Sequence, residues 1–161
     1  MKPFATADLC DQFGDEVRVA LPVFRGWGGA AAFGGAVETV RVFEDNALVR
    51  QALEEQGGGR VLVVDGGGSI RTALVGGNLA ALARSNGWSG LVVNGAIRDI
   101  AEIVATAVGV KALAAVPRKS AKTGAGDRGV AVTFAGVTFR PGDYCYADDD
   151  GVVVASRDLQ S

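Results

Sequence analysis

The fold of this chain depends on two stretches of sequence, Arg60-Val-Leu-Val-Val-Asp65 and Leu91-Val-Val-Asn94-Gly-Ala-Ile-Arg-Asp99. Each contains a run of large apolar residues, the pattern of a strand buried on both faces of a sheet. A helix is predicted between them, over residues 78–86, because Leu79, Leu82 and Ala83 recur at helical spacing. The centre of the chain therefore predicts alternating strands and helices.

Strands dominate both flanks of this centre. On the N-terminal side we predict a helix over Thr6–Phe13 with Thr6 as its N-cap, strands over 17–23 and 33–43, and a helix over 45–56. Asp45 or its neighbour caps that second helix, and the glycines at 57–59 end it. After a short helix over 99–104 we predict strands over 111–116, 129–134, 137–139, 143–146 and 151–155. Since no linker or repeat divides the chain, residues 1–161 are predicted to form one mixed α/β domain of sandwich type.

Composition narrows the class of protein. Hydrophobic residues make up 48% of the chain and charged residues 21%, which predicts a globular domain. No apolar run approaches the ~20 residues of a membrane span, and acids stand where a signal peptide would be apolar, so we expect a cytosolic protein. Its net charge of −2 and lack of a basic cluster argue against a nucleic-acid partner. We expect Cys10 and Cys145 to be unpaired core residues.

The chain contains no histidine. This excludes Ser-His-Asp and Cys-His catalysis and any zinc site built on imidazole. A base must then be a carboxylate, a water, a lysine, a tyrosine or a thiolate. A metal would need oxygen ligands, which favours Mg²⁺ or Mn²⁺.

Glycines follow the first buried strand, at 66–68. A strand followed by glycines is typical of loops that bind a dinucleotide or S-adenosylmethionine. Here, however, Arg71 occupies the last glycine position of a GxGxxG pattern, and no helix begins directly after the loop. We therefore favour a tight turn that leads into the next element.

A second glycine pair precedes the central helix, in the segment Gly76, Gly77, Asn78 and Leu79. The free N–H groups and the positive end of a helix dipole at such a place bind carboxylates or phosphates. The alternative is an ordinary turn in which Asn78 is the N-cap.

The second buried strand runs into Arg98 and Asp99. Ligands in α/β proteins usually lie at strand ends, and adjacent side chains point in different directions. Asp99 can therefore bind a hard cation while Arg98 binds a carboxylate or a developing enolate. The alternative is an ordinary N-cap at Asp99 beside an exposed arginine.

Two charged segments are weaker candidates for a functional site. The run Asp148–Asp150 could form a calcium or magnesium loop, but we favour a solvated turn before a strand. Lys119 and Lys122 are candidate bases, although nothing flanking them indicates a buried lysine of low pKa.

Taken together, these segments resemble the RraA-like family, named for the regulator of ribonuclease activity A. The resemblance runs from Thr6 to Val152 and includes the segments 42–46, 61–69, 94–99 and 117–120. The family includes class II 4-hydroxy-4-methyl-2-oxoglutarate aldolases and oxaloacetate decarboxylases. It implies a swivelling β/β/α fold and a ring-like homotrimer, which can stack as a hexamer.

The resemblance also implies roles for the candidate residues. Arg98 matches the arginine that binds substrate and acts in catalysis, and Asp99 matches the ligand of a divalent cation, Mg²⁺ or Mn²⁺. Gly76, Gly77, Asn78 and Leu79 match the loop whose backbone holds the carboxylate of a small 2-oxo acid. Family aldolases usually carry an aspartate at the position of Gly77, so we expect weakened aldol cleavage here, better-preserved decarboxylation, and a gain in aldolase activity on Gly77→Asp. The alternative function is a non-catalytic regulator of ribonuclease E.

Overall fold

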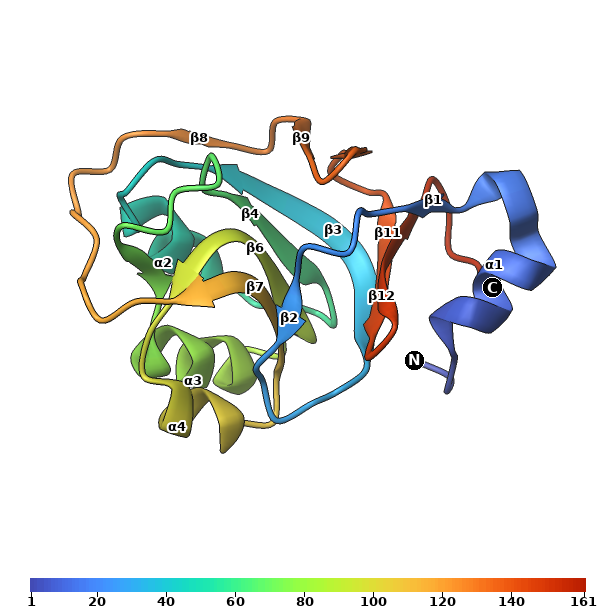
Figure 1. Ribbon diagram of the computed structural model, residues 1–161, viewed down its shortest axis with the longest axis horizontal. Helices are drawn as coiled ribbons and strands as arrows, with labels where there is room; N and C mark the ends of the chain where they lie inside the picture. The colour runs from blue at the N-terminus through green and yellow to red at the C-terminus, as the bar shows by residue number, and fades with distance from the viewer.

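The computed structural model describes residues 1–161 and has three layers (Figure 1). Helices α2 (Ala47–Leu53), α3 (Gly77–Ser85) and α4 (Ile100–Val104) cover one face of a central sheet. An antiparallel group of strands packs against the other face, and α1 (Thr6–Phe13) lies outside that group. The layers thus follow the order β/β/α, as the resemblance implies, and the prediction of a mixed α/β fold is confirmed.

The central sheet is parallel at its core. Four strands pair in the order β3 (Phe33–Arg41), β4 (Val61–Asp65), β6 (Gly90–Ile97) and β7 (Gly109–Ala115). Three short strands extend it: β2 (Arg25–Gly26) pairs with β7, β5 (Ala73–Val75) with β6, and β8 (Asp127–Arg128) with β3. Because β4, β6 and β7 run in parallel, their carboxyl ends meet at one edge, beside the start of α3 and α4.

The antiparallel layer contains β1 (Arg18–Val19), β11 (Tyr144–Asp148) and β12 (Gly151–Ala155), with a separate hairpin of β9 (Val132–Phe134) and β10 (Val137–Phe139). Strand β3 joins both layers, because its first residues pair with β11 and its last with β4. A Cβ on Gly35, inside that strand, would overlap the carbonyl oxygen of Gly59. A glycine is therefore required where β3 crosses between the layers.

Both faces of the central sheet are buried. A cluster of 20 buried apolar residues lies on the helix side, and one of 14 lies between the two strand layers. Phe33 packs over β6 and β7, where a Cβ on Gly90 or Gly109 would overlap its ring. Burial on both sides explains why β4 and β6 are continuously apolar in sequence.

Several details differ from the sequence predictions. The N-cap of α1 is Ala5, whereas Thr6 donates through its N–H and hydroxyl to Asp148. Only Arg18–Val19 of the predicted 17–23 strand pairs, with β12. Pro22, which has no N–H, follows within that segment and limits its pairing. Strands β2, β5 and β8 were not predicted, because two or three residues give no measurable periodicity.

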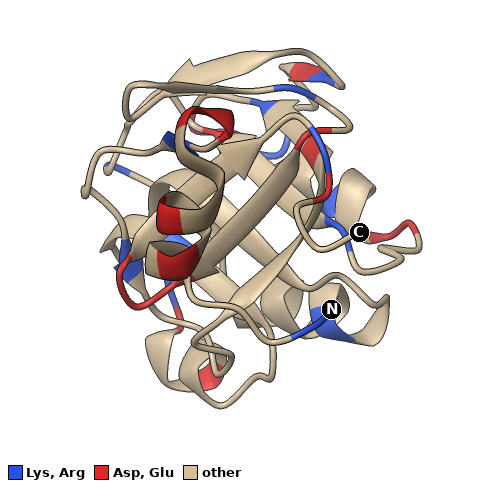
Figure 2. Ribbon diagram, turned by 90° about the vertical axis from the view of Figure 1, so that its right-hand side faces the viewer, with Lys and Arg blue, Asp and Glu red and all other residues tan.

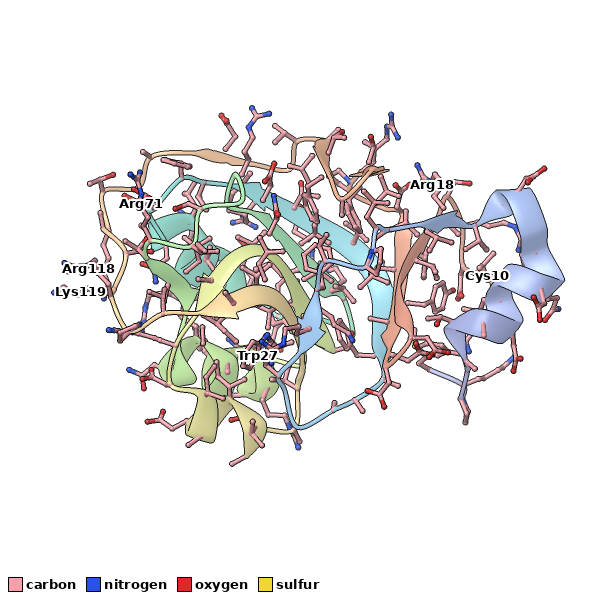
Figure 3. The ribbon with its side chains drawn as sticks, in the orientation of Figure 1. Cys10, Arg18, Trp27, Arg71, Arg118 and Lys119 are labelled. Atoms are coloured by element: carbon pink, nitrogen blue, oxygen red, sulfur yellow. The ribbon has the colours of Figure 1, made fainter.

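Other predictions are confirmed. The 148–151 segment is the turn between β11 and β12. Cys10 and Cys145 form no disulfide; Cys145 is buried in the core as predicted, whereas Cys10 is only half-buried. In Figure 3, Cys10 projects from α1 toward the β11–β12 hairpin. None of the helices combines the length and the apolar character needed to cross a bilayer. Figure 2 shows acidic and basic residues of both signs along the ribbon; the absence of a nucleic-acid partner stays a prediction.

Candidate functional site

A cavity of about 260 Å³ lies where β5 and β6 end and α2 and α3 begin. Of the six site residues predicted from the sequence, five line it. The full lining consists of Asn46, Ala47, Arg50, Gln51, Glu54, Ala73, Gly76, Asn78, Leu79, Arg98, Asp99, Lys119, Ser120 and Lys122. The sixth, Gly77, is joined to the cavity by a hydrogen bond to Asp99. The structure therefore brings two segments about 20 residues apart into one site.

Asp99 has an unusual backbone conformation. Its φ of 62° and ψ of 48° lie in the left-handed region, which aspartate tolerates better than most residues. Its side chain makes no capping bond to α4 and instead accepts a hydrogen bond from the Gly77 N–H, 3.0 Å away at Oδ2. A Cβ on Gly76 would lie only 2.7 Å from that oxygen. Asp99 is thus not an ordinary N-cap, and Gly76 makes room for its carboxylate.

Arg98 presents a guanidinium group without a counter-ion. Its backbone N–H donates to the carbonyl of Val75 at 2.9 Å, which fixes the end of β6 against β5. Its Nη1 donates to the carbonyl of Pro117 at 3.4 Å, and no carboxylate pairs with it. A half-buried cation held in this way can bind an anionic ligand through its remaining N–H groups.

The start of α3 supplies further donors. Its N-cap is Gly76, not Asn78, and no acidic residue stands in its first turn. The N–H of Gly77 bonds to Asp99, whereas those of Asn78 and Leu79 have no acceptor within the chain. Both residues line the cavity. Two free N–H groups at a helix N-terminus form a site for a carboxylate or phosphate.

Glu102 is a functional candidate that the sequence analysis missed. It lies on α4, three residues after Asp99, and its carboxylate takes the space of a side chain at position 77. A Cβ on Gly77 would overlap Glu102 Oε2 and lie 3.0 Å from the Glu102 Cβ. The spacing of Asp99 and Glu102, which is typical of one face of a helix, was the available signal.

Lys119 and Lys122 reach the cavity from the loop between β7 and β8. Figure 3 shows Lys119 beside Arg118 at the end of the molecule farthest from α1. Together with Arg50 and Arg98 they give the lining four cations against two carboxylates, Glu54 and Asp99. The cavity therefore suits a ligand with more than one negative charge.

A buried aspartate fixes this loop. Asp45, 3% exposed, accepts hydrogen bonds from the N–H and hydroxyl of Thr123, from the Gly124 N–H and from the Ala47 N–H. Burial raises the pKa of Asp45, but the bonds from Thr123, Ala47 and Gly124 outweigh it and hold the pKa below its usual value. The charged carboxylate thus ties the lysine loop to the start of α2. The N-cap of α2 is Asn46, the neighbour of Asp45, and Asp45 contributes by accepting a hydrogen bond from the Ala47 N–H.

The glycines at 66–68 do not form a nucleotide-binding loop. Gly67 and Gly68 have φ values of 66° and 77°, and the Gly67 N–H donates to Asp65 Oδ1 at 2.9 Å. The chain then enters β5, and the next helix begins only at Gly77. No helix N-terminus therefore follows the loop to bind a phosphate, and the predicted tight turn is confirmed.

The donor set at Asp99 is compatible with a divalent cation, though not with a site made only of protein ligands. No group of three or more histidine, cysteine, aspartate or glutamate side chains could hold a metal ion. Asp99 Oδ2 accepts one hydrogen bond, and its Oδ1 has no partner within the chain. One carboxylate with several waters is a usual arrangement for Mg²⁺.

These features define a β/β/α protein in which a helix terminus with free N–H groups lies beside Arg98 and Asp99 in one cavity. A family model described as RraA-like, Aldolase/RraA, matches residues 6–154. The chain belongs to the RraA-like family.

Its relatives are similar over their whole length. A protein of Alkalilimnicola ehrlichii is 59% identical over 96% of both chains, and one of Burkholderia multivorans is 58% identical over 97% of this chain and 98% of its own. Both carry the provisional name 4-hydroxy-4-methyl-2-oxoglutarate aldolase.

Two solved structures share the fold closely. One from Geobacillus kaustophilus, titled an S-adenosylmethionine:2-dimethylmenaquinone methyltransferase, has a TM-score of 0.96 and 53% identity over 98% of both chains. The other, the RNA-processing inhibitor RraA of Thermus thermophilus, has a TM-score of 0.93 and 50% identity over 97% of this chain and 94% of its own. Similar folds in this family therefore carry three different functional names.

Proposed function

We propose that this chain is a divalent-metal-dependent carbon–carbon lyase that cleaves 4-hydroxy-4-methyl-2-oxoglutarate and decarboxylates oxaloacetate. One observation carries the proposal: Arg98, Asp99 and the free N–H groups of α3 converge on one cavity, and the Glu102 carboxylate lies against Gly77 at the start of that helix. The names of relatives with 58–59% identity support the aldolase activity.

Substrate binding follows from the donors of the site. The N–H groups of Asn78 and Leu79 hold the carboxylate next to the ketone, where the dipole of α3 adds to their attraction. Arg98 lies beside them and donates to the ketone oxygen. Lys119 and Lys122, on the loop fixed by Asp45, attract the second carboxylate of the substrate.

The reaction needs stabilisation of an enolate. Cleavage of the C3–C4 bond leaves its electron pair on the 2-oxo unit as pyruvate enolate, and decarboxylation of oxaloacetate leaves the same species. Arg98 neutralises the oxygen on which this charge develops. A Mg²⁺ or Mn²⁺ ion held by Asp99 and waters would supply Lewis-acid stabilisation of that charge.

Glu102 takes the proton-transfer role that the sequence left unassigned. In aldol cleavage the 4-hydroxyl loses its proton as C3–C4 breaks, and C3 of the enolate then gains one. The Glu102 carboxylate accepts the first proton and returns it, directly or through water. Decarboxylation has no hydroxyl to deprotonate, so it depends on Glu102 only for protonation of C3.

The two other functional names find less support in the site. A methyltransferase needs a place for S-adenosylmethionine, and the glycine loop leads into β5 rather than a helix. A regulator of ribonuclease E acting through its surface has no need of Arg98 and Asp99 in a cavity.

The test is pyruvate release from both substrates, followed with lactate dehydrogenase, with Mg²⁺ or Mn²⁺ and with EDTA. Because free metal decarboxylates oxaloacetate slowly, the background is measured with the Asp99→Asn variant at the same metal concentration. We expect turnover above that background on both substrates, abolished by EDTA. Turnover equal to the background on both would reject the proposal and favour the regulator.

A further inference from the structure

A second cavity, of about 330 Å³, lies between α1, the 19–24 segment and the β11–β12 turn. It shares no lining residue with the candidate active site. Most of its lining is apolar, and Val19 and Leu21 are each 57% exposed there. Apolar side chains left uncovered around a hollow of this size are typical of a binding site for a small molecule.

One charged side chain is buried at this cavity. Lys111, on β7, is 5% exposed, although it lies between Val110 and Ala112 of the helix-side core and points to the opposite face of the sheet. It is paired in register with Gly26 of β2, and a Cβ on Gly26 would lie 3.4 Å from its Nζ. The missing side chain at Gly26 thus leaves room for the ammonium group.

The ammonium group of Lys111 has no partner within the chain. It makes no hydrogen bond, and no carboxylate lies within the 4.0 Å of an ion pair. Asp149 and Asp150 also line the cavity, but both are exposed in the turn. Lysines are rarely buried to this degree unless they are paired, because burial removes their hydration. The Lys111 ammonium group is therefore free to pair with an anionic ligand in this cavity.

We propose that this second cavity binds a small carboxylic acid with an apolar body. Its carboxylate pairs with Lys111, and its body packs against Val19, Leu21 and Phe24. The volume is near the lower end of small-molecule sites, which suits an acid of a few carbons rather than a long chain. The proposal is independent of the lyase activity, because the two cavities share no residue.

The probe is 4-methylpentanoate, measured by isothermal titration calorimetry and thermal melting on the full chain. At ten times its Kd we expect it to raise the Tm by roughly 3–6 °C. Lys111→Met keeps most of the length of the side chain and removes its charge, so binding should weaken roughly ten- to a hundredfold. Arg98→Met is the matched control, since it removes a cation from the other cavity and should leave this binding unchanged.

Without the probe, Lys111→Met should melt at the same temperature or higher, because it removes an unpaired buried charge, and pyruvate release should not change. Lys111→Gln, which keeps polarity, provides a second folded variant. Equal binding to wild type and both Lys111 variants would overturn the proposal. So would a change of oligomeric state in either variant, which would show that Lys111 pairs with an acid of another copy of the chain.

Discussion

Glu102→Gln removes a negative charge beside Gly77 and leaves the size of the side chain almost unchanged. Glu102 is exposed, and its carboxylate makes no hydrogen bond within the chain. Substitutions at such positions change the free energy of unfolding by roughly 0.5 kcal/mol or less. Any large effect on activity would therefore come from chemistry rather than from loss of folding.

The expected effect differs between the two substrates. A positioned general base contributes about 10²–10⁴-fold, or roughly 3–5 kcal/mol of barrier. We expect kcat for cleavage of 4-hydroxy-4-methyl-2-oxoglutarate to fall by that factor in Glu102→Gln, because the 4-hydroxyl proton loses its acceptor. Decarboxylation of oxaloacetate should fall less than about tenfold, since only protonation of C3 is affected. KM should change little, because Glu102 is not assigned to binding.

The assay is pyruvate release from both substrates at saturating Mg²⁺. Glu54→Gln is the matched control, because it makes the same change in a carboxylate that lines the cavity but pairs with Arg50 at 3.3 Å. It should remain within about twofold of wild type on both substrates. Equal losses on both substrates in Glu102→Gln, or no loss on either, would refute the proton-transfer role.

The position of the Glu102 carboxylate also limits the effect of Gly77→Asp. Gly77 does not have a positive φ, so a side chain there brings no backbone strain, but its Cβ would overlap the Glu102 carboxylate. In wild type the new aspartate must displace Glu102, which limits the gain in aldolase activity. In a Glu102→Ala background that place is open, because alanine has no side-chain atom beyond Cβ. We therefore expect Gly77→Asp to raise the rate of aldol cleavage by a larger factor when it is added to the Glu102→Ala variant than when it is added to wild type.

Three further predictions address the metal site, the loop and the assembly. Asp99→Asn tolerates the left-handed backbone and should abolish metal-dependent turnover, while circular dichroism stays unchanged and calorimetry shows weaker Mg²⁺ binding. Asp45→Asn should lower the Tm by roughly 4–10 °C at pH 7, since buried N–H donors lose a charged acceptor. Because the folded-state pKa of Asp45 is lowered, its stabilisation is present above the usual value of 3.8 and is lost as pH falls through the folded pKa, so the difference in Tm should shrink in acid. Light scattering should show a trimer, or a hexamer of two trimers, and a monomer at micromolar concentration would contradict the assembly that the family implies.

The sequence predicts those site residues that follow a recognisable strand or begin a recognisable helix. Buried parallel strands have continuous apolar sequences, and their carboxyl ends meet at one edge, so Arg98 could be placed at a ligand site from the strand before it. The glycines before α3 have an equally local signal, a helix start without a side-chain cap. Arg98 and the glycines before α3 lie in one cavity because β5 pairs with the end of β6. A strand of three residues is too short to be predicted from the sequence, so this pairing could not be predicted either.

The residues that the sequence did not assign depend on contacts between distant segments. Lys119 and Lys122 lie in a polar stretch that could equally be a solvated loop. They reach the cavity because Asp45 binds Thr123, 78 residues away, and Ala121 pairs with the backbone at Glu44 and Asn46. No pattern within the loop encodes that attachment, so a reading of the sequence alone could not place the lysines at the site.

Asp99 shows why adjacent residues can have separate roles at this site. Arg98 directly follows β6, its N–H bonds to the carbonyl of Val75, and its guanidinium reaches the carbonyl of Pro117. The next residue turns into the left-handed region, which directs the Asp99 carboxylate back to Gly77 rather than onto α4. A non-glycine residue in that conformation costs roughly 1–2 kcal/mol, and the surrounding structure must offset the cost. The hydrogen bond from Gly77 offsets part of it, and a cation at Oδ1 would offset more. Binding of a divalent ion should therefore stabilise the β6–α4 junction as well as the enolate.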